Sequence, residues 1–294
     1  MANILILIGD KPEARSEGYY TFQKLQQRER DTYTCARYRD VEFRLTPAVT
    51  SIMVNGVSID EYDLVYIRDF HGYEPERNTI ADYCKKNGVV FANQDTAVSQ
   101  KISKLAQYMI FASHDIPFPE SVYAHTSRLA QAAEETLAYP MIVKSILASS
   151  GDDNYYVESR EQLDEILSRH ADQKFIAQEA VPNEGDFRIV TLGDRALTVY
   201  RRVAASGDHR NNVSKGGDSQ YISHEDTPDG MHDIALKVSR AVGRDVCGVD
   251  VMVDTRDESM VVLEANFNFG VTTAPEGLFD AMAEYFHDQA TRKK

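Results

Sequence analysis

Short, continuous apolar runs alternate with amphipathic stretches through the first hundred residues. Three short runs are apolar except at their ends: Asn3–Ile8, Asp63–Arg68 and Val89–Asn93. Uninterrupted apolar runs of this length are typical of parallel strands that are buried on both faces. Helical periodicity over Ser16–Arg28 and Arg77–Asn87, the latter stopped by Gly88, separates these runs. The order of strand, helix and strand predicts an open, mostly parallel α/β sheet of the Rossmann-like kind.

Two further patterns refine this first region. Ile52–Ile59 carries Asn55-Gly56 between β-forming residues, which predicts a hairpin. No GxGxxG motif follows the first strand, so we predict no dinucleotide site there.

A second region begins near Ala97, and a third begins near Pro182. The predicted helices of both regions are Val98–Ser113, Ser127–Leu137, Glu161–Arg169, Gly230–Ala241 and Gly277–Ala290. The predicted strands are Met141–Lys144, Tyr155–Val157, Lys174–Val181, Asp186–Leu192, Ala196–Arg202, Val246–Val253 and Met260–Asn266. Ser127 is the expected N-cap of its helix, since its hydroxyl can accept a hydrogen bond from a free backbone N–H.

Composition narrows the class of protein. The chain has 294 residues and a formal net charge of −14, which argues against nucleic acid or an anionic membrane as a partner. Cys35, Cys84 and Cys247 lie far apart without CxxC spacing, so neither a disulfide framework nor a zinc site is expected. The N-terminus lacks the basic region of a signal peptide, and no apolar run is long enough to span a membrane. A reducing cytoplasm is the location that we predict.

The hairpin formed by Val246–Val253 and Met260–Asn266 carries acids inside apolar strands. Folding it about its midpoint places Asp250 opposite Glu264, and Asn266 shares a face with Glu264. Two facing carboxylates in apolar surroundings need a cation, and ligands that offer only oxygen favour Mg²⁺. The alternative is that both acids lie on a solvated sheet face. The valines and the leucine on both sides of these acids make the surroundings apolar, which favours the metal site.

A basic cluster lies between these strands and the centre of the chain. The segment from Arg201 to Gly217 holds four formal cations among glycines and asparagines, and Arg188 precedes it by one strand. Guanidinium groups bind phosphate and carboxylate oxygens with two hydrogen bonds. Solvated surface charge is the alternative. A Mg²⁺ site combined with an arginine-rich loop indicates phosphoryl transfer.

At this point the chain resembles the ATP-grasp enzymes, in particular the RimK-like ligases that add glutamate to protein C-termini. Segments match the family pattern in order: Ser103–Leu105 with Ile116–Pro119 ("DKL…GIxxP"), Tyr139–Ser145 ("yPvVvKp"), Ile176–Val181 ("fi-QEfI"), Asp186–Arg188 ("DiR"), Arg201–Gly217 ("RR…g-FRsNlhrGG"), Cys247–Asp250 ("aGVDll") and Leu263–Asn266 ("lEvN"). The resemblance implies three parts: an α/β domain over 1–97, and two α+β ATP-grasp subdomains over 98–181 and 182–294.

The resemblance also implies roles for residues. ATP would be bound by Lys104, Lys144, Gln178, Glu179, Val181, Asp186 and Arg188. The two lysines would contact phosphates, Gln178, Glu179 and the backbone N–H of Val181 would contact adenine, and Asp186 would contact the ribose. The γ-phosphate and the activated carboxylate would face Arg202, Arg210 and Asn212. Mg²⁺, usually two ions, or Mn²⁺ would be held by Asp250, Glu264 and Asn266.

The implied activity is ATP-dependent joining of a carboxylate to an amine through an acylphosphate. The substrate would be an amino acid or an acidic peptide or protein tail, and the resemblance is compatible with a homodimer or homotetramer. Two alternatives remain: an ATP-grasp kinase, and a non-catalytic nucleotide-binding protein. The latter is favoured by one departure, since Ser149–Asp153 has one glycine and two aspartates where the family's phosphate loop is richer in glycine.

Overall fold

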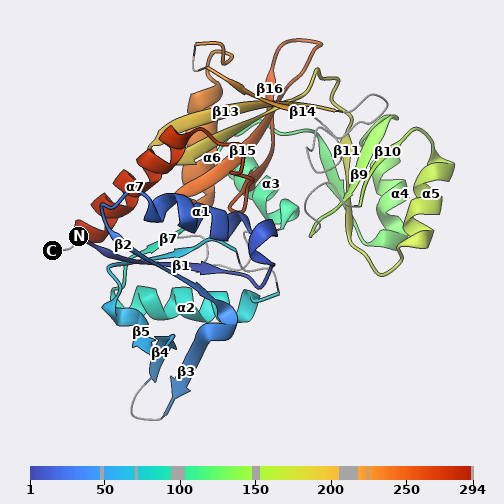
Figure 1. The fold of residues 1–294 in the computed structure, drawn as a ribbon. Coiled ribbons are helices and arrows are strands. Elements are labelled where there is room, and N and C mark those ends of the chain that lie inside the picture. The colour runs from blue at the N-terminus through green and yellow to red at the C-terminus, as the bar shows by residue number, and fades with distance from the viewer. Residues whose placement is uncertain are drawn as a thin grey trace.

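The structure is a computed structural model that describes residues 1–46, 50–69, 72–93, 103–147, 153–204, 218–223 and 225–292. Strands and helices gather in three bodies (Figure 1): an N-terminal α/β layer, a small central sheet with its helices, and a larger C-terminal sheet. No helix among these residues combines the length and the apolarity needed to cross a bilayer.

The N-terminal sheet is parallel, as predicted. Its strands lie in the order β2 (Thr32–Arg37), β1 (Asn3–Ile8), β6 (Leu64–Ile67) and β7 (Phe91–Ala92). Helix α1 (Glu17–Gln26) lies on one face, and α2 (Glu74–Asn87), which ends at the left-handed Gly88, lies on the other (Figure 1). Both faces of β1 are therefore buried, which explains its continuous apolar run. Strand β2 was not predicted, because its threonines and cysteine break the apolar pattern.

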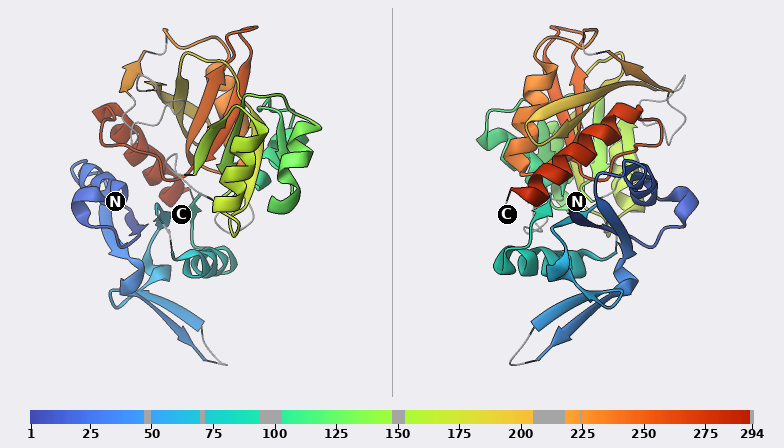
Figure 2. Two further views of the ribbon diagram at one scale, coloured as in Figure 1. Left: turned by 90° about the vertical axis from the view of Figure 1, so that its right-hand side faces the viewer. Right: turned by 60° about the vertical axis from the view of Figure 1, so that its left-hand side comes forward.

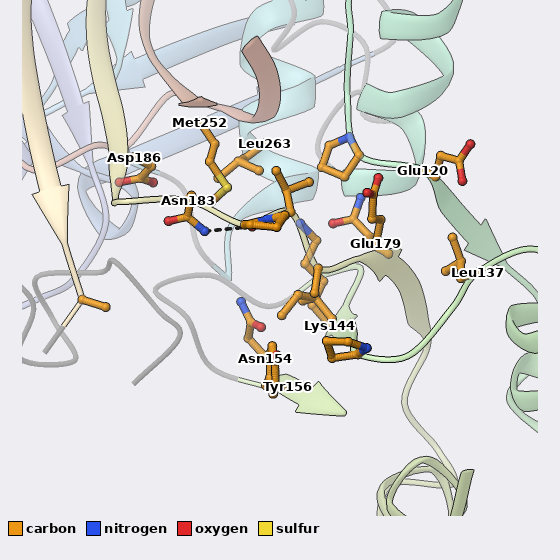
Figure 3. Close-up of a pocket in the computed structure, with 18 of the residues that line it drawn as sticks. Glu120, Leu137, Lys144, Asn154, Tyr156, Glu179, Asn183, Asp186, Met252 and Leu263 are labelled. Atoms are coloured by element: carbon orange, nitrogen blue, oxygen red, sulfur yellow. Dashed lines mark hydrogen bonds between the residues drawn. The ribbon is translucent and has the colours of Figure 1, made fainter. Parts of the chain in front are cut away.

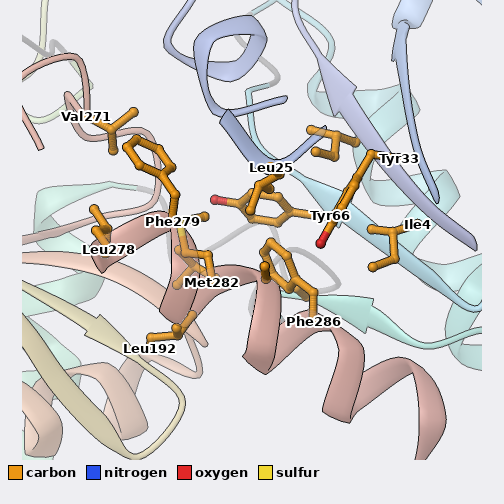
Figure 4. Close-up of a cluster of buried hydrophobic side chains, with 14 of the residues drawn as sticks. Ile4, Leu25, Tyr33, Tyr66, Leu192, Val271, Leu278, Phe279, Met282 and Phe286 are labelled. Atoms are coloured by element: carbon orange, nitrogen blue, oxygen red, sulfur yellow. The ribbon is translucent and has the colours of Figure 1, made fainter. Parts of the chain in front are cut away.

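The C-terminal helix α7 (Glu276–Thr291) packs back onto the N-terminal sheet beside α1. Figure 4 shows Phe279, Met282 and Phe286 of this helix against Tyr66 and Ile4 of the sheet. One apolar cluster thus joins the two ends of the chain and holds the N-terminal layer against the C-terminal sheet.

A separate antiparallel sheet projects from the N-terminal layer (Figure 2). It has the order β3 (Val41–Leu45), β4 (Thr50–Val54) and β5 (Val57–Ser58). Asn55 and Gly56 both have positive φ, 50° and 82°, which confirms the predicted hairpin turn. Strand β3 was missed by the sequence reading. Two short 3₁₀ helices flank this sheet in the chain, η2 (Tyr38–Asp40) and η3 (Ile59–Glu61), and a third, η1 (Glu13–Arg15), precedes α1.

The central sheet has the order β10 (Asn154–Val157), β9 (Met141–Ser145), β11 (Phe175–Glu179) and β8 (Ser121–Tyr123). Helices α4 (Thr126–Glu134) and α5 (Arg160–Arg169) cover one face. Helix α3 (Lys104–Ser113) precedes them and is capped by the Ser103 side chain. The predicted N-cap of α4 was wrong. His125 caps that helix, accepting from the N–H of Ser127, because an imidazole nitrogen can serve as the acceptor.

The C-terminal sheet is antiparallel. Its order is β14 (Asp218–Ile222), β13 (Arg195–Val203), β12 (Asp186–Leu192), β15 (Val246–Val253) and β16 (Met260–Asn266), with α6 (Met231–Val242) on one face. The predicted pairing of Asp250 with Glu264 is confirmed, followed by a register shift after Asp250. Strand β14 was not predicted.

Candidate functional site

A cavity of about 960 Å³ lies between the central and the C-terminal sheets. Alternation along β9 and β11 turns Met141 and Val143 towards the helices, so that Ile142, Lys144 and Gln178 face the cavity. Met252 and Leu263 of the C-terminal sheet approach from the other side, and Figure 3 shows them across the cavity from Leu137 and Glu179. The walls are mainly apolar with a few polar groups, the usual make-up of a small-molecule site.

Lys144 is the buried cation of this cavity. Its Nζ donates to the hydroxyl of Tyr108 at 2.9 Å, and among the described residues no carboxylate lies within salt-bridge distance of it. Burial lowers the pKa of Lys144 to about 8, although Glu264 and Asp250 favour its charged form. An ammonium that is this poorly compensated is suited to bind an anion.

Tyr108 ties Lys144 to its surroundings. The Tyr108 hydroxyl also contacts the Gln178 amide oxygen at 3.3 Å and the carbonyl of Leu263 at 2.8 Å. The sequence reading missed this tyrosine, because it lies on an amphipathic helix where an aromatic residue reads as core. Only its contacts across three elements reveal its place.

Paired charges cross the C-terminal sheet on the face that turns away from α6. Arg188 binds Asp250 with two hydrogen bonds of 2.7 Å, and Arg202 contacts both Asp186 and, at 3.0 Å, Asp250. Directly opposed positions on neighbouring strands produce these pairs. Burial alone would raise the pKa of Asp250, but Arg188 and Arg202 outweigh it and hold this pKa below its ordinary value.

Asp250, Glu264 and Asn266 lie together at the end of this row of charges. The Asn266 amide donates to Asp250 at 3.3 Å and to Glu264 at 3.0 Å, so it lies between the two acids. A half-turn of that amide exchanges its nitrogen for its oxygen. Among the described residues no cluster of three His, Cys, Asp or Glu could hold a metal ion. This set of two carboxylates and one amide is all oxygen, and it fits Mg²⁺.

The strand end that carries these ligands is clamped by buried arginines. Arg68, at the end of β6, donates to the carbonyls of Phe267 at 2.7 Å and Phe269 at 2.6 Å. Arg244 donates to the carbonyl of Ala265. The residues directly after Asn266 are therefore held by the N-terminal sheet, about 200 positions earlier in the chain.

The remaining predicted residues have different surroundings. Lys104 Nζ lies 3.8 Å from Glu264, and Val181 lines the cavity. Glu179 pairs with Arg256 at 2.5 Å, a partner that the sequence did not suggest because it sits in a hairpin turn. Asp186 lines the cavity, but its carboxylate is bound by Arg202. Arg210, Asn212 and most of the glycine-poor loop Ser149–Asp153 lie outside the described residues.

Comparisons with known proteins agree with this geometry. The RimK-like ATP-grasp domain family matches residues 101–279, more than half of the chain. A protein of Trichodesmium erythraeum (strain IMS101) named "Probable alpha-L-glutamate ligase" is 25% identical over 266 residues, covering 86% of this chain and 85% of the relative. Human N-acetylaspartylglutamate synthase A is 28% identical over 200 residues, covering 65% of this chain. The match spans only about half of that human relative, 50% of its length.

A solved structure shares the whole fold. The ATP-grasp ligase PsnB, complexed with minimal precursor, Mg and ADP, superposes with a TM-score of 0.73 over 98% of both chains at 16% sequence identity. At this identity the likeness concerns the fold, and it confirms the predicted arrangement of an α/β N-terminal layer followed by ATP-grasp sheets.

Proposed function

The chain belongs to the RimK-like ATP-grasp family, and we infer that it is an ATP-dependent ligase that forms C–N bonds. We propose that it joins a carboxylate to the amine of an amino acid or an acidic peptide through an acylphosphate. The observation that supports this most is the buried Lys144, which has no ion-pair partner among the described residues, in a large cavity beside a row of paired charges. The names of the relatives, which concern glutamate, favour an acidic substrate.

In this proposal the cavity binds ATP. Adenine lies between β9 and β11 on one side and Met252 and Leu263 on the other, where apolar walls replace water. Gln178, Glu179 and the backbone of Val181 supply its polar contacts. Asp186 is the candidate partner of the ribose, and its pairing with Arg202 would orient it.

Lys104 and Lys144 contact the phosphates in this scheme, and Arg202, Arg210 and Asn212 face the γ-phosphate. Asp250, Glu264 and Asn266 would hold Mg²⁺, two ions by family resemblance, with Mn²⁺ as a substitute. When bound, Mg²⁺ supplies positive charge that neutralises the phosphate oxygens. Arg188 keeps Asp250 ionised and aimed, since it binds both of its carboxylate oxygens.

The proposed reaction has two steps. An oxygen of the substrate carboxylate attacks the γ-phosphorus of ATP, the bond to ADP breaks, and an acylphosphate forms. The amine nitrogen then attacks the acyl carbon, the carbon–oxygen bond to phosphate breaks, and the nitrogen's surplus proton leaves with phosphate or water. The protein's part is to orient the reactants, shield the acylphosphate from water and bind the developing negative charge. We propose the cytoplasm as the compartment, because ATP is supplied there and all three cysteines are free.

The test is incubation of the protein with ATP, Mg²⁺ and pools of amino acids and acidic peptides. ADP, phosphate and product masses are measured, with hydroxylamine present in one arm to trap the acylphosphate as a hydroxamate. The expected result is ADP release with an amide product, and loss of both in Glu264→Gln but not in the exposed control Glu165→Gln. A phosphorylated product without an amide would instead identify a kinase. Nucleotide binding without any ADP release would identify a non-catalytic protein.

A further inference from the structure

The projecting sheet has one open edge. Within the described residues, β3 pairs with β4 and with no other strand, so the backbone groups along its outer side have no partner strand. Figure 2 shows that β3 and β4 stand clear of the rest of the molecule. An open, projecting edge is a template for pairing with another strand unless its side chains prevent this.

The side chains of β3 do not prevent it. Glu42 and Arg44 share one face and form an ion pair at 2.8 Å, with their side chains 62% and 54% exposed. Val41 and Phe43 lie on the other face, half-buried against the N-terminal core, and Leu45 continues that apolar face with 70% exposure. Edge strands that avoid pairing usually carry charged side chains, often lysine, or proline. Strand β3 has no proline, and its two charges have opposite signs, so a partner strand can neutralise both. This strand carries opposite charges placed evenly about Phe43.

We propose that β3 pairs with β3 of a second copy of this chain, antiparallel and centred on Phe43. In this register Glu42 lies opposite the partner's Arg44, and Arg44 lies opposite the partner's Glu42. Val41 covers the partner's Leu45 on the other face. The strand is therefore complementary to itself in both charge and apolar contact, as a two-fold symmetric interface requires.

The order of the two charges along β3 decides which pairing is favourable. Antiparallel pairing about Phe43 always places position 42 against position 44, so the pair must have opposite signs, as Glu42 and Arg44 have. A parallel pairing in register would place like charges opposite each other and is disfavoured. A strand of five residues buries less area than a stable dimer interface does. We therefore expect a weak association that is populated only at high protein concentration. It does not depend on the ligase activity.

Charge reversal tests the proposal in solution. Sedimentation analysis of the full chain over a range of concentrations should show a monomer–dimer equilibrium. Glu42→Arg and Arg44→Glu should each raise the dimer dissociation constant about tenfold or more, since each places like charges opposite each other twice. The double variant, in which the two charges are exchanged, restores complementarity and should dimerise as the original chain does.

Mixing the two single variants is the decisive experiment. The Glu42→Arg and Arg44→Glu variants, each monomeric alone, should associate with one another, because one strand is then basic and the other acidic. Glu165→Arg, an exposed reversal on α5, is the matched control and should leave dimerisation unchanged, and all variants should retain ligase turnover. A wild-type chain that stays monomeric at high concentration overturns the proposal. So does a dimer that is indifferent to the reversals, or single variants that do not associate on mixing.

Discussion

The two sheets that enclose the cavity handle charge in opposite ways. The central sheet presents an apolar wall with one ammonium, Lys144, whose polar contact is a tyrosine hydroxyl. The C-terminal sheet presents alternating cations and anions, in which Arg188 and Arg202 each bind a carboxylate. The first arrangement leaves a charge that a ligand can satisfy, whereas the second satisfies its charges within the protein.

Because of this difference, substitutions on the two sheets should affect ligand binding and folding stability in different proportions. Removing a buried charge that has no ion-pair partner relieves a desolvation cost, whereas removing one member of a buried pair strands the other. We therefore expect substitutions on the two sheets to be equally harmful to catalysis and very different in their effect on folding.

The largest effect is expected for Asp250→Asn. This change leaves Arg188 and Arg202 without their shared carboxylate, so the free energy of unfolding should fall by about 3 kcal/mol. Turnover should fall at least about 100-fold. Urea denaturation and ADP release measure the two effects, with Asp257→Asn in the exposed turn as control. A variant as stable as the original would show that these charges are not coupled.

Lys144→Met should reduce turnover by a similar order, about 100-fold, because the phosphates lose their buried cation. Its stability should be unchanged or higher by about 1 kcal/mol, since the buried ammonium no longer has to be desolvated. The same two measurements apply. A stability loss as large as that of Asp250→Asn would remove the distinction between the two sheets.

The pKa of Lys144 predicts a dependence of ATP binding on pH. Below about 8 the ammonium is charged and can bind phosphate, and above this value it becomes neutral because burial lowers its pKa. The dissociation constant for ATP should therefore rise about tenfold between pH 7 and 9. Lys144→Arg keeps its charge over this range and should show no such rise. Calorimetry provides the comparison, and parallel profiles for the two proteins would argue against Lys144 as the phosphate contact.

The smallest effect is expected at the rim of the cavity. Arg256 pairs with Glu179, but its side chain is 55% exposed, so solvent screens the pair and Arg256→Ala should leave the thermal stability almost unchanged. The KM for ATP should change by less than about threefold. Thermal unfolding and steady-state kinetics check this, and a large rise in KM would give Glu179 and Arg256 a larger part in adenine binding than we propose.

The sequence reading was accurate where a local pattern carried the information. The bounds of β1, β15 and β16, and the Asp250–Glu264 register, agree with the structure because apolar runs and a short turn leave few alternatives. The family and the enzyme class were recognised from ordered motifs. Strands β2, β3, β8 and β14 were missed, since each mixes polar and apolar residues without a buried run.

The sequence by itself determined which residues could carry charge and oxygen ligands, and which short segments would be strands. Only the tertiary structure decided what those residues contact. Lys144 donates a hydrogen bond to Tyr108, and Arg68 donates to the carbonyl of Phe267, just after Asn266. Arg188 binds Asp250 because β12 and β15 pair in a register that places the two residues opposite each other. Such contacts join positions tens to hundreds of residues apart, and local sequence patterns contain no record of them.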